Sequence, residues 1–414
     1  MDISDTISVK STVGFNSFND LSALPDNFER FLIEVRRHLH RHPELGLNEF
    51  KTSATIRDIL ETHGMVVRGP FATTGLCVDI EGDFPGPIIA YRADMDALPI
   101  QELNDVDYVS QNKGIAHLCG HDAHSTIGIG VALLLNHLRH QIHGTVRVFF
   151  QPNEEGIPSG APLMIKDGIL DGVEAAFAVH VDPTLDVGMY GLKSGAVTAS
   201  ADRFRIRVKG PSTGHSARPH QAVDTIWVGT QILNSLYQLA GRMTDARNST
   251  VFTVTRMHGG DAYNVIPDCV EYGGTLRCTV ASDIAVFTRL VRDTSHAIGG
   301  SFGATVEVEF DDGTLPVIND TRLLERTRAA IRARLGDDAI VEIPVPSMGA
   351  EDFAHYLNHV PGMLLRVGTS SGTRTSHPLH DARFDIDEQA LEQTAALMSA
   401  VLISTLHEMS GQSK

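Results

Sequence analysis

The chain has 414 residues, which is more than one hydrophobic core usually holds, so we expect two domains. Its formal net charge of −17 argues against nucleic acid and against an anionic membrane surface, because both need a basic binding surface. The four cysteines are too few and too scattered for a disulfide framework, which favours a reducing compartment, and we expect the cytoplasm.

The hydropathy pattern gives no sign of a membrane anchor or a leader. No apolar stretch approaches the roughly 20 residues that a membrane span needs. Residues 1–24 are polar and lack the basic and apolar regions of a signal peptide, so we interpret them as a flexible N-terminal extension.

Helices and continuous apolar strands alternate in the first half of the chain. Such strands, separated by helices, are typical of a mainly parallel sheet covered on both faces. The expected helices cover 25–39, 49–63 and 125–138, and the expected strands cover 75–80, 87–91, 145–150 and 175–179. We interpret the histidines at 38, 40 and 42 as solvated residues near the end of the first helix.

Residues able to bind metal follow three of these strands directly. In open sheets of this kind, ligands bind beyond the carboxyl ends of the strands. Because three strands end in such residues at one edge of the sheet, the pattern favours a shared metal site at this edge. The residues are Asp94 and Asp96, Glu154 and Glu155, and His180.

The middle of the chain has a different pattern. From about residue 199 to 312, half-exposed strands and two helices follow the order β-α-β-β-α-β, which is typical of a ferredoxin-like α+β unit. After it, helix and apolar strand patterns resume, with a strand over 361–367. The last helix is expected to begin in 384–388, where Asp385 and Glu388 resemble a capping box. The predicted domains are therefore 1–198 with 313–414, and the inserted unit 199–312.

Five side chains form the candidate metal site. A thiolate, imidazoles and a carboxylate suit zinc or a similar divalent ion, and five ligands exceed what one tetrahedral site needs. We therefore expect two ions that share a bridging water or hydroxide. The candidate ligands are Cys119, His121, Glu155, His180 and His380.

Other polar residues near these ligands are assigned supporting roles. Glu154 stands next to a ligand and can act as a general base that moves protons. Asp96 can orient a ligand imidazole, whereas Asp94 could orient a ligand or contact the metal, and the sequence does not separate these roles. His124 is interpreted as a structural residue behind the ligands.

The motifs in this order resemble the aminoacylase and carboxypeptidase family of co-catalytic metallopeptidases. The branch they resemble most comprises amidohydrolases that cleave hippurate and indole-acetyl amino acids. The resemblance covers nearly the whole chain after about residue 25. It rests on the segments 40–46, 92–99, 119–122, 150–155, 214–220, 264–267, 348–353 and 379–380.

The resemblance implies roles for residues of both domains. It matches the five candidate ligands to the family's metal ligands and Glu154 to its general base. It also implies that the inserted unit is a lid and dimerisation domain. In that unit, His215 would reach an active site, often the partner subunit's, and Asn264 and Arg277 would hold the substrate carboxylate.

At three places the sequence differs from the usual residues of this branch, and we expect these places to lie near the substrate. Asn153 and Leu118 each replace a usual Ala, and residues 211–213 replace a Gly-rich turn. We expect these departures to affect the acyl-group preference and not the chemistry.

The sequence thus predicts a metal-dependent amidohydrolase that splits N-acyl amino acids, or related small amides or dipeptides, into acid and amine. Two divalent ions per subunit are expected, zinc or manganese, with cobalt or nickel as alternatives. We expect a homodimer or tetramer that acts on a small molecule. The alternatives are a carboxypeptidase or dipeptidase on the same scaffold and, more distantly, a binding protein that has lost turnover.

Overall fold

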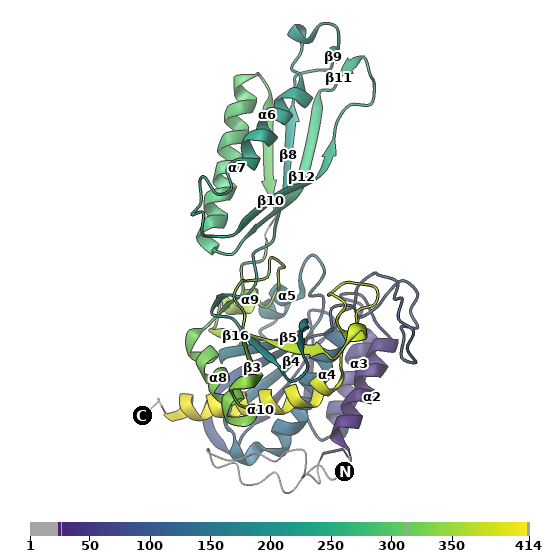
Figure 1. Cartoon of the computed structure of the whole chain (residues 1–414), viewed down its shortest axis with the longest axis vertical. Helices are drawn as coiled ribbons and strands as arrows, with labels where there is room; N and C mark the ends of the chain where they lie inside the picture. Colours follow the sequence, from purple (N-terminus) through teal and green to yellow (C-terminus); the bar gives the residue numbers. More distant parts are fainter. Residues whose placement is uncertain (1–23, 26, 312, 412–414) are drawn as a thin grey trace. The chain divides into compact units, whose positions relative to one another are not determined.

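The structure is a computed structural model that describes residues 24, 25, 27–311 and 313–411 (Figure 1). The predicted flexible extension of residues 1–24 lies outside the described residues except for Leu24, which is buried. The chain forms two compact units. Apart from residues that are not described, unit 1 comprises Met1–Gly195, Ile318–Pro344 and His355–Lys414, and unit 2 comprises Ala196–Val317 and Val345–Ala354.

An eight-stranded sheet forms the centre of unit 1, with the strand order β1-β2-β4-β3-β5-β16-β6-β15. The four central strands β4, β3, β5 and β16 run parallel, whereas β1, β2 and β6 join them through antiparallel pairs. The prediction of a mainly parallel sheet is confirmed. The strands are β1 (Val67–Phe71), β2 (Gly75–Glu81), β3 (Phe84–Asp94), β4 (His143–Gln151), β5 (Val173–Asp186), β6 (Tyr190–Leu192), β15 (Ile340–Glu342) and β16 (Gly362–Ser370).

Helices α4 and α10 pack against β3 and β4 and against each other, and α2 packs on both helices. The final helix begins at Gln389, so the capping box predicted at 384–388 is wrong. Asp387 accepts the Gln389 backbone N–H, whereas Asp385 is buried. The helices of unit 1 are α2 (Phe28–Arg41), α3 (Phe50–Thr62), α4 (His121–His137), α5 (Gly160–Lys166), α8 (Thr321–Leu335) and α10 (Gln389–Gly411), and the single turn α9 (Ala354–Leu357) spans the boundary of the two units.

Helix α4 is buried on all sides over 121–135, as expected for a helix enclosed by the sheet and other helices. Two glycines allow this close packing. A Cβ at Gly128 would lie 3.0 Å from Ala93 Cβ, and one at Gly130 would lie 2.8 Å from Ala395 Cβ. The polar residues in the first turn of α4 are therefore held inside the protein.

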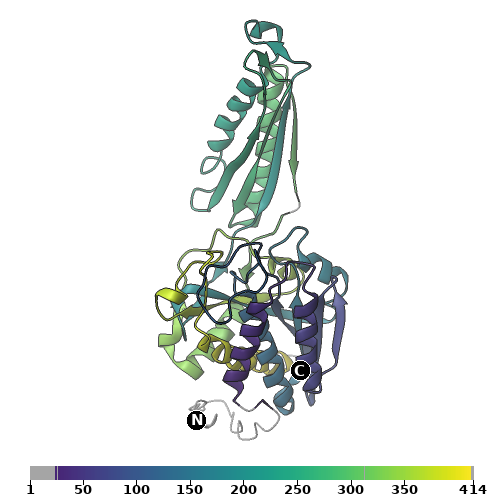
Figure 2. The same ribbon diagram turned by 90° about the vertical axis from the view of Figure 1, so that its right-hand side faces the viewer.

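Unit 2 contains a four-stranded antiparallel sheet with the order β10-β12-β8-β13, and α6 and α7 pack against it (Figures 1 and 2). This strand order, with the chain order β-α-β-β-α-β, confirms the predicted ferredoxin-like unit. A short ladder pairs β9 with β11. The elements are β8 (Asp202–Lys209), β9 (Gly214–His215), α6 (Thr225–Tyr237), β10 (Thr250–His258), β11 (Val265–Ile266), β12 (Cys269–Cys278), α7 (Ala281–Ser301) and β13 (Thr305–Phe310).

Alternating residues of β8, β12 and β13 form the core of unit 2 under the two helices. They include Ile206, Val208, Tyr272 and Val306. Across both units, the described helices are all too short or too polar to cross a membrane.

Two adjacent glycines in α7 give a matched stability test for unit 2. A Cβ at buried Gly299 would lie 2.2 Å from Val306 Cγ2, whereas a Cβ at exposed Gly300 would meet nothing within 4 Å. Gly299→Ala should lower the free energy of unfolding by about 1–3 kcal/mol through overpacking. Gly300→Ala should raise it by about 0.5–1 kcal/mol, because alanine loses less backbone entropy in a helix.

Denaturant unfolding, followed by the fluorescence of the single tryptophan, measures both effects. This residue, Trp227, lies on α6 and contacts Phe302, so it reports on unit 2. Equal shifts for the two alanine variants would contradict the packing of Gly299 against β13.

Candidate metal centre

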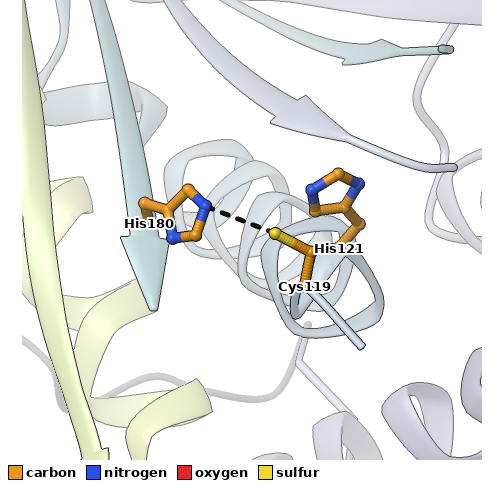
Figure 3. A group of neighbouring side chains, drawn as sticks. All are labelled: Cys119, His121 and His180. Carbon is orange, nitrogen blue, oxygen red and sulfur yellow. Dashed lines mark hydrogen bonds between the residues drawn. The ribbon is translucent and has the colours of Figure 1, made fainter. Parts of the chain in front are cut away.

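Cys119, His121 and His180 form the first group of metal-ligand atoms, which lie within 4.8 Å of one another (Figure 3). Cys119 Sγ points at His180 Nε2, 3.7 Å away. The helix expected from residue 125 begins earlier in the structure, so His121 is the first residue of α4, after Gly120 with a φ of 86°. A Cβ at Gly120 would lie 2.4 Å from Val181 Cγ2, so the turn fits closely against β5. His180 was expected beyond the end of its strand and lies inside the longer β5.

Glu155 and His380 extend this group. His380 Nε2 lies 3.0 Å from Glu155 Oε1, and ligand atoms of both residues lie within 4.8 Å of Cys119 Sγ. Glu154 and Glu155 in turn each have a carboxylate oxygen within that distance of a His121 ring nitrogen. The structure therefore brings all five candidate ligands and Glu154 together in unit 1.

Hydrogen bonds fix which nitrogen of His180 can bind a metal. His180 Nδ1 donates to the Val181 carbonyl at 2.8 Å, which leaves the Nε2 lone pair toward Cys119. His124 uses both nitrogens otherwise: Nε2 accepts the Val181 N–H at 2.9 Å, and Nδ1 donates to Asp94 Oδ1 at 2.7 Å. This geometry agrees with a structural role for His124 behind the ligands.

His121 provides the test of whether the site fits a cation. Its Nδ1 lies 3.2 Å from Asp96 Oδ1, the arrangement in which a carboxylate orients a ligand imidazole. Its Nε2 is buried and has no hydrogen-bond partner among the described residues. A buried polar atom without a partner is costly, and the lone pair that deprotonated Nε2 offers to a bound cation would satisfy it. The donor set of thiolate, imidazoles and carboxylates also suits zinc or a related ion.

The carboxylates of Asp96 and Asp94 have different hydrogen-bond partners. Asp96 accepts the backbone N–H groups of Glu154 and Glu155, at 3.0 Å each, in addition to facing His121. Asp94 uses one oxygen for His124 and the other for Arg92 Nη1 at 2.5 Å. Asp94 Oδ2 is also 3.8 Å from His121 Nε2. This pattern favours an orienting role for Asp94.

Burial and nearby carboxylates set the charge of the site. Burial raises the pKa of the Cys119 thiol well above its usual value. Burial would lower the pKa of His121, but Asp94 and the hydrogen bond to Asp96 raise it well above the usual value. The carboxylates thus favour positive charge at His121. Because metal ligands must be deprotonated, a bound ion would displace protons from both residues.

His215, Asn264 and Arg277 all lie in unit 2. His215 and Asn264 are exposed near the β9–β11 ladder, and His215 Nδ1 accepts the Ala217 N–H at 3.1 Å, so its Nε2 carries the proton. Arg277 lies on β12 and donates to the Met348 carbonyl at 2.9 Å. The substrate-related roles of these three residues stay predictions.

Two of the sequence departures lie at buried positions in unit 1, and their effect on the acyl-group preference stays a prediction. Leu118 is fully buried in the core of unit 1. Asn153 is also buried, and its Nδ2 donates to the Pro158 carbonyl at 2.6 Å. Its φ of 55° lies in the left-handed region that Asn tolerates better than most residues, so it shapes the turn before Glu154.

Comparison with known proteins identifies relatives that match most of the chain. A model of peptidase family M20/M25/M40 matches residues 90–404. The chain is 39% identical over 366 residues to the N-acetyl-L-cysteine deacetylase of Bacillus subtilis, covering 88% of this chain and 85% of that protein. It is 36% identical over 391 residues to IAA-amino acid hydrolase ILR1-like 2 of Arabidopsis thaliana, covering 93% and 87%.

Further matches extend the range of activities and include a crystal structure. Thermostable carboxypeptidase 2 of Saccharolobus solfataricus is 34% identical over 388 residues, covering 93% of this chain and 96% of that protein. A crystal structure of a Bacillus subtilis protein, described as a dinuclear metal binding peptidase from the M20 family, aligns with a TM-score of 0.82. It is 36% identical and covers 92% of this chain and 99% of that one.

Glu49 supports the turn before the twin glutamates, a role that was not predicted from the sequence. Its carboxylate accepts the Asn153 backbone N–H at 2.9 Å and the Thr74 hydroxyl at 2.7 Å. The side chain is fully buried, and burial raises its pKa from 4.5 to about 7. No local motif signals this role, because Glu49 and Asn153 are 104 residues apart.

The raised pKa predicts how Glu49→Gln changes stability with pH. Below pH 4.5 the carboxyl is protonated in the folded and unfolded states and contributes no pH dependence. Between about pH 4.5 and 7 the unfolded state loses this proton first, so burial increasingly destabilises the wild type. The unfolding free energy of Glu49→Gln minus that of wild type should therefore rise by on the order of 3 kcal/mol and level off above pH 7.

Urea denaturation of both metal-free proteins from pH 4.5 to 8 measures this difference. The exposed Glu174 on β5 supplies a control, and Glu174→Gln should show a flat difference. A flat profile for Glu49→Gln as well would mean that Glu49 ionises normally in the folded protein.

Proposed function

The chain belongs to peptidase family M20/M25/M40, and on that basis we propose that it hydrolyses the amide bond of N-acyl amino acids or related small amides. The enzyme is a metal-dependent hydrolase, and the products would be a carboxylic acid and an amino acid. One observation carries the proposal: His121, Glu155, His180 and His380 each place a ligand atom within 4.8 Å of Cys119 Sγ, and the buried His121 Nε2 has no hydrogen-bond partner among the described residues.

Two overlapping donor groups support a site for two divalent ions. Cys119, His121 and His180 form one group, and Cys119, Glu155 and His380 form the other. Because Cys119 belongs to both groups, we propose that the two ions lie next to each other. When bound, such ions polarise a carbonyl oxygen and make a water molecule more acidic. Zinc or manganese is proposed, with cobalt or nickel as alternatives.

Glu154 is the proposed general base. Its Oε2 lies 3.9 Å from His121 Nε2, so it borders the metal ligands. Glu154 takes a proton from the attacking water as the water oxygen bonds to the amide carbon. It then gives this proton to the leaving nitrogen as the C–N bond breaks. The carboxylate ends the reaction ionised, as it began.

His215, Asn264 and Arg277 are the proposed contributions of unit 2. The proton on His215 Nε2 is available to stabilise the oxyanion that forms on the substrate. Arg277 and Asn264 would hold the substrate carboxylate, and a guanidinium can do so through two parallel hydrogen bonds. In this proposal unit 2 is the lid and dimerisation domain, and unit 1 is the catalytic domain.

The proposal extends to assembly and location. We propose a homodimer or tetramer, as the family resemblance implies. A cytoplasmic location is proposed because the described cysteines are all free and mostly buried.

A carboxypeptidase or dipeptidase is the second candidate, because the chain is similar to a thermostable carboxypeptidase. Such an enzyme acts on peptides, whereas the first candidate acts on acylated single amino acids. A binding protein without turnover is disfavoured, because Glu154 stands beside a complete set of ligand candidates.

The experiment is a substrate panel assayed with Glu154→Gln as the key variant. Metal-loaded wild type should cleave N-acetyl and N-benzoyl amino acids faster than dipeptides, and faster than the same compounds with a blocked carboxylate. Glu154→Gln should retain its metal but lose about 10²–10⁴-fold in kcat, equivalent to about 2.7–5.5 kcal/mol. Glu174→Gln, a change of the same kind at an exposed site, should keep full activity.

Each contrary result has a definite meaning. Preference for dipeptides would select the second candidate. Loss of metal together with activity in Glu154→Gln would show that Glu154 is a ligand. Full activity after complete removal of metal would contradict the proposed function.

A further inference from the structure

A fully buried arginine lies behind the metal centre. Arg36 is on α2, and its side chain has no exposed surface. Its Nε donates to Asp122 Oδ2 at 2.8 Å, and its Nη2 donates to Asp385 Oδ1 at 2.9 Å. A third contact reaches Glu388 Oε1 at 3.4 Å. A buried charge is costly unless it is paired, so these contacts hold the guanidinium in one position.

The two main partners of Arg36 flank metal-ligand candidates on different segments. Asp122 directly follows His121 in the first turn of α4. Asp385 lies in the segment that leads from His380 to α10. One guanidinium therefore links the segment of His121 to the segment of His380, which are more than 250 residues apart in the sequence.

Each end of this link is fixed by further contacts. At one end, His40 lies between Asp122 Oδ2 at 2.7 Å and Glu102 Oε1 at 3.0 Å. Burial and Arg36, whose Nη2 lies 3.3 Å from His40 Nδ1, would lower the pKa of His40, but Asp122 and Glu102 raise it above the usual value, so the pair of carboxylates favours an imidazolium that holds Asp122. At the other end, Asp385 accepts the Tyr108 hydroxyl at 2.7 Å. The interpretation of His40 as a solvated residue is therefore wrong.

The position of His380 shows why such a link is needed. Its φ is 66°, a left-handed conformation that is uncommon for a residue other than glycine. It lies in a loop, its side chain is half exposed, and its backbone N–H donates to the Leu118 carbonyl at 2.7 Å. The loop thus depends on contacts with other segments to keep His380 near Glu155.

We propose that Arg36 is a positioning residue for the metal centre, and that its bridge between Asp122 and Asp385 fixes His121 relative to His380. This inference rests on the proposed function, which makes both histidines metal ligands. Arg36 does not touch metal or substrate in this account. A Lys has a single ammonium group and cannot reproduce the forked geometry that joins two carboxylates in different directions.

The test compares Arg36→Lys with Arg37→Lys. Arg37 is the next residue on α2, is partly exposed, and bonds to Glu388 without contacting Asp122 or Asp385. Zinc affinity is measured by chelator competition, and the ligand arrangement is followed by the visible spectrum of the cobalt-loaded protein. Arg36→Lys should bind zinc about 10–100-fold more weakly, the usual effect of losing a group that supports metal ligands, and should alter the cobalt spectrum. Arg37→Lys should match wild type in both measurements.

Asp385→Asn gives a second route if Arg36→Lys does not fold. It breaks the ionic bridge at the His380 end and leaves the Asp122 end intact, so it should also weaken zinc binding and alter the cobalt spectrum. Wild-type zinc affinity and an unchanged spectrum in a folded Arg36→Lys or Asp385→Asn protein would overturn the inference. Absence of zinc binding by wild type would instead contradict the proposed function itself.

Discussion

The carboxylate of Asp96 is the contact on which the geometry of the centre depends. It accepts the backbone N–H groups of Glu154 and Glu155 and lies 3.2 Å from His121 Nδ1. Three segments therefore meet at one buried side chain: the end of β3, the turn after β4 and the start of α4. These hydrogen bonds join the three segments to one another. The parallel pairing of β3 with β4 makes it possible, because it brings both carboxyl ends to the same edge.

This contact also explains how two adjacent glutamates can have different tasks. Asp96 holds their backbone and not their side chains, so both carboxylates can point toward the ligands. Glu155 meets His380, whereas Glu154 approaches His121. One can then remain a ligand while the other moves protons. The buried Glu49 supports the same turn through Asn153.

The sequence predicted the parallel sheet, the ferredoxin-like unit and the meeting of the five ligand candidates. These features follow from local patterns: apolar runs, alternating strands, and polar residues near strand ends. The position of His180 inside β5 was missed, because its strand continues past the apolar run through polar residues to Asp186. The start of α10 was missed because Asp385 resembles a helix cap in sequence but binds Arg36.

The buried ionic contacts could not be predicted for a different reason. Arg36 meets partners 86 and 349 residues away, and a histidine or arginine on a helix gives the same local pattern whether it is solvated or buried among carboxylates. The contacts of Asn153 are a similar case, because its hydrogen bonds to Glu49 and to the Pro158 carbonyl depend on how the turn before Glu154 packs. Such groups become visible only when the packing of distant segments is known.

The proposed function requires that the five candidate ligands, grouped around Cys119, hold two adjacent divalent ions. Anomalous diffraction from crystals of the zinc-loaded protein would locate the bound ions and is the most direct measurement. We expect two neighbouring peaks, with zinc at about 2.3 Å from Cys119 Sγ and about 2.0–2.1 Å from the ligand nitrogens of His121, His180 and His380. A single peak, or peaks that Cys119 and His121 do not contact, would contradict this expectation.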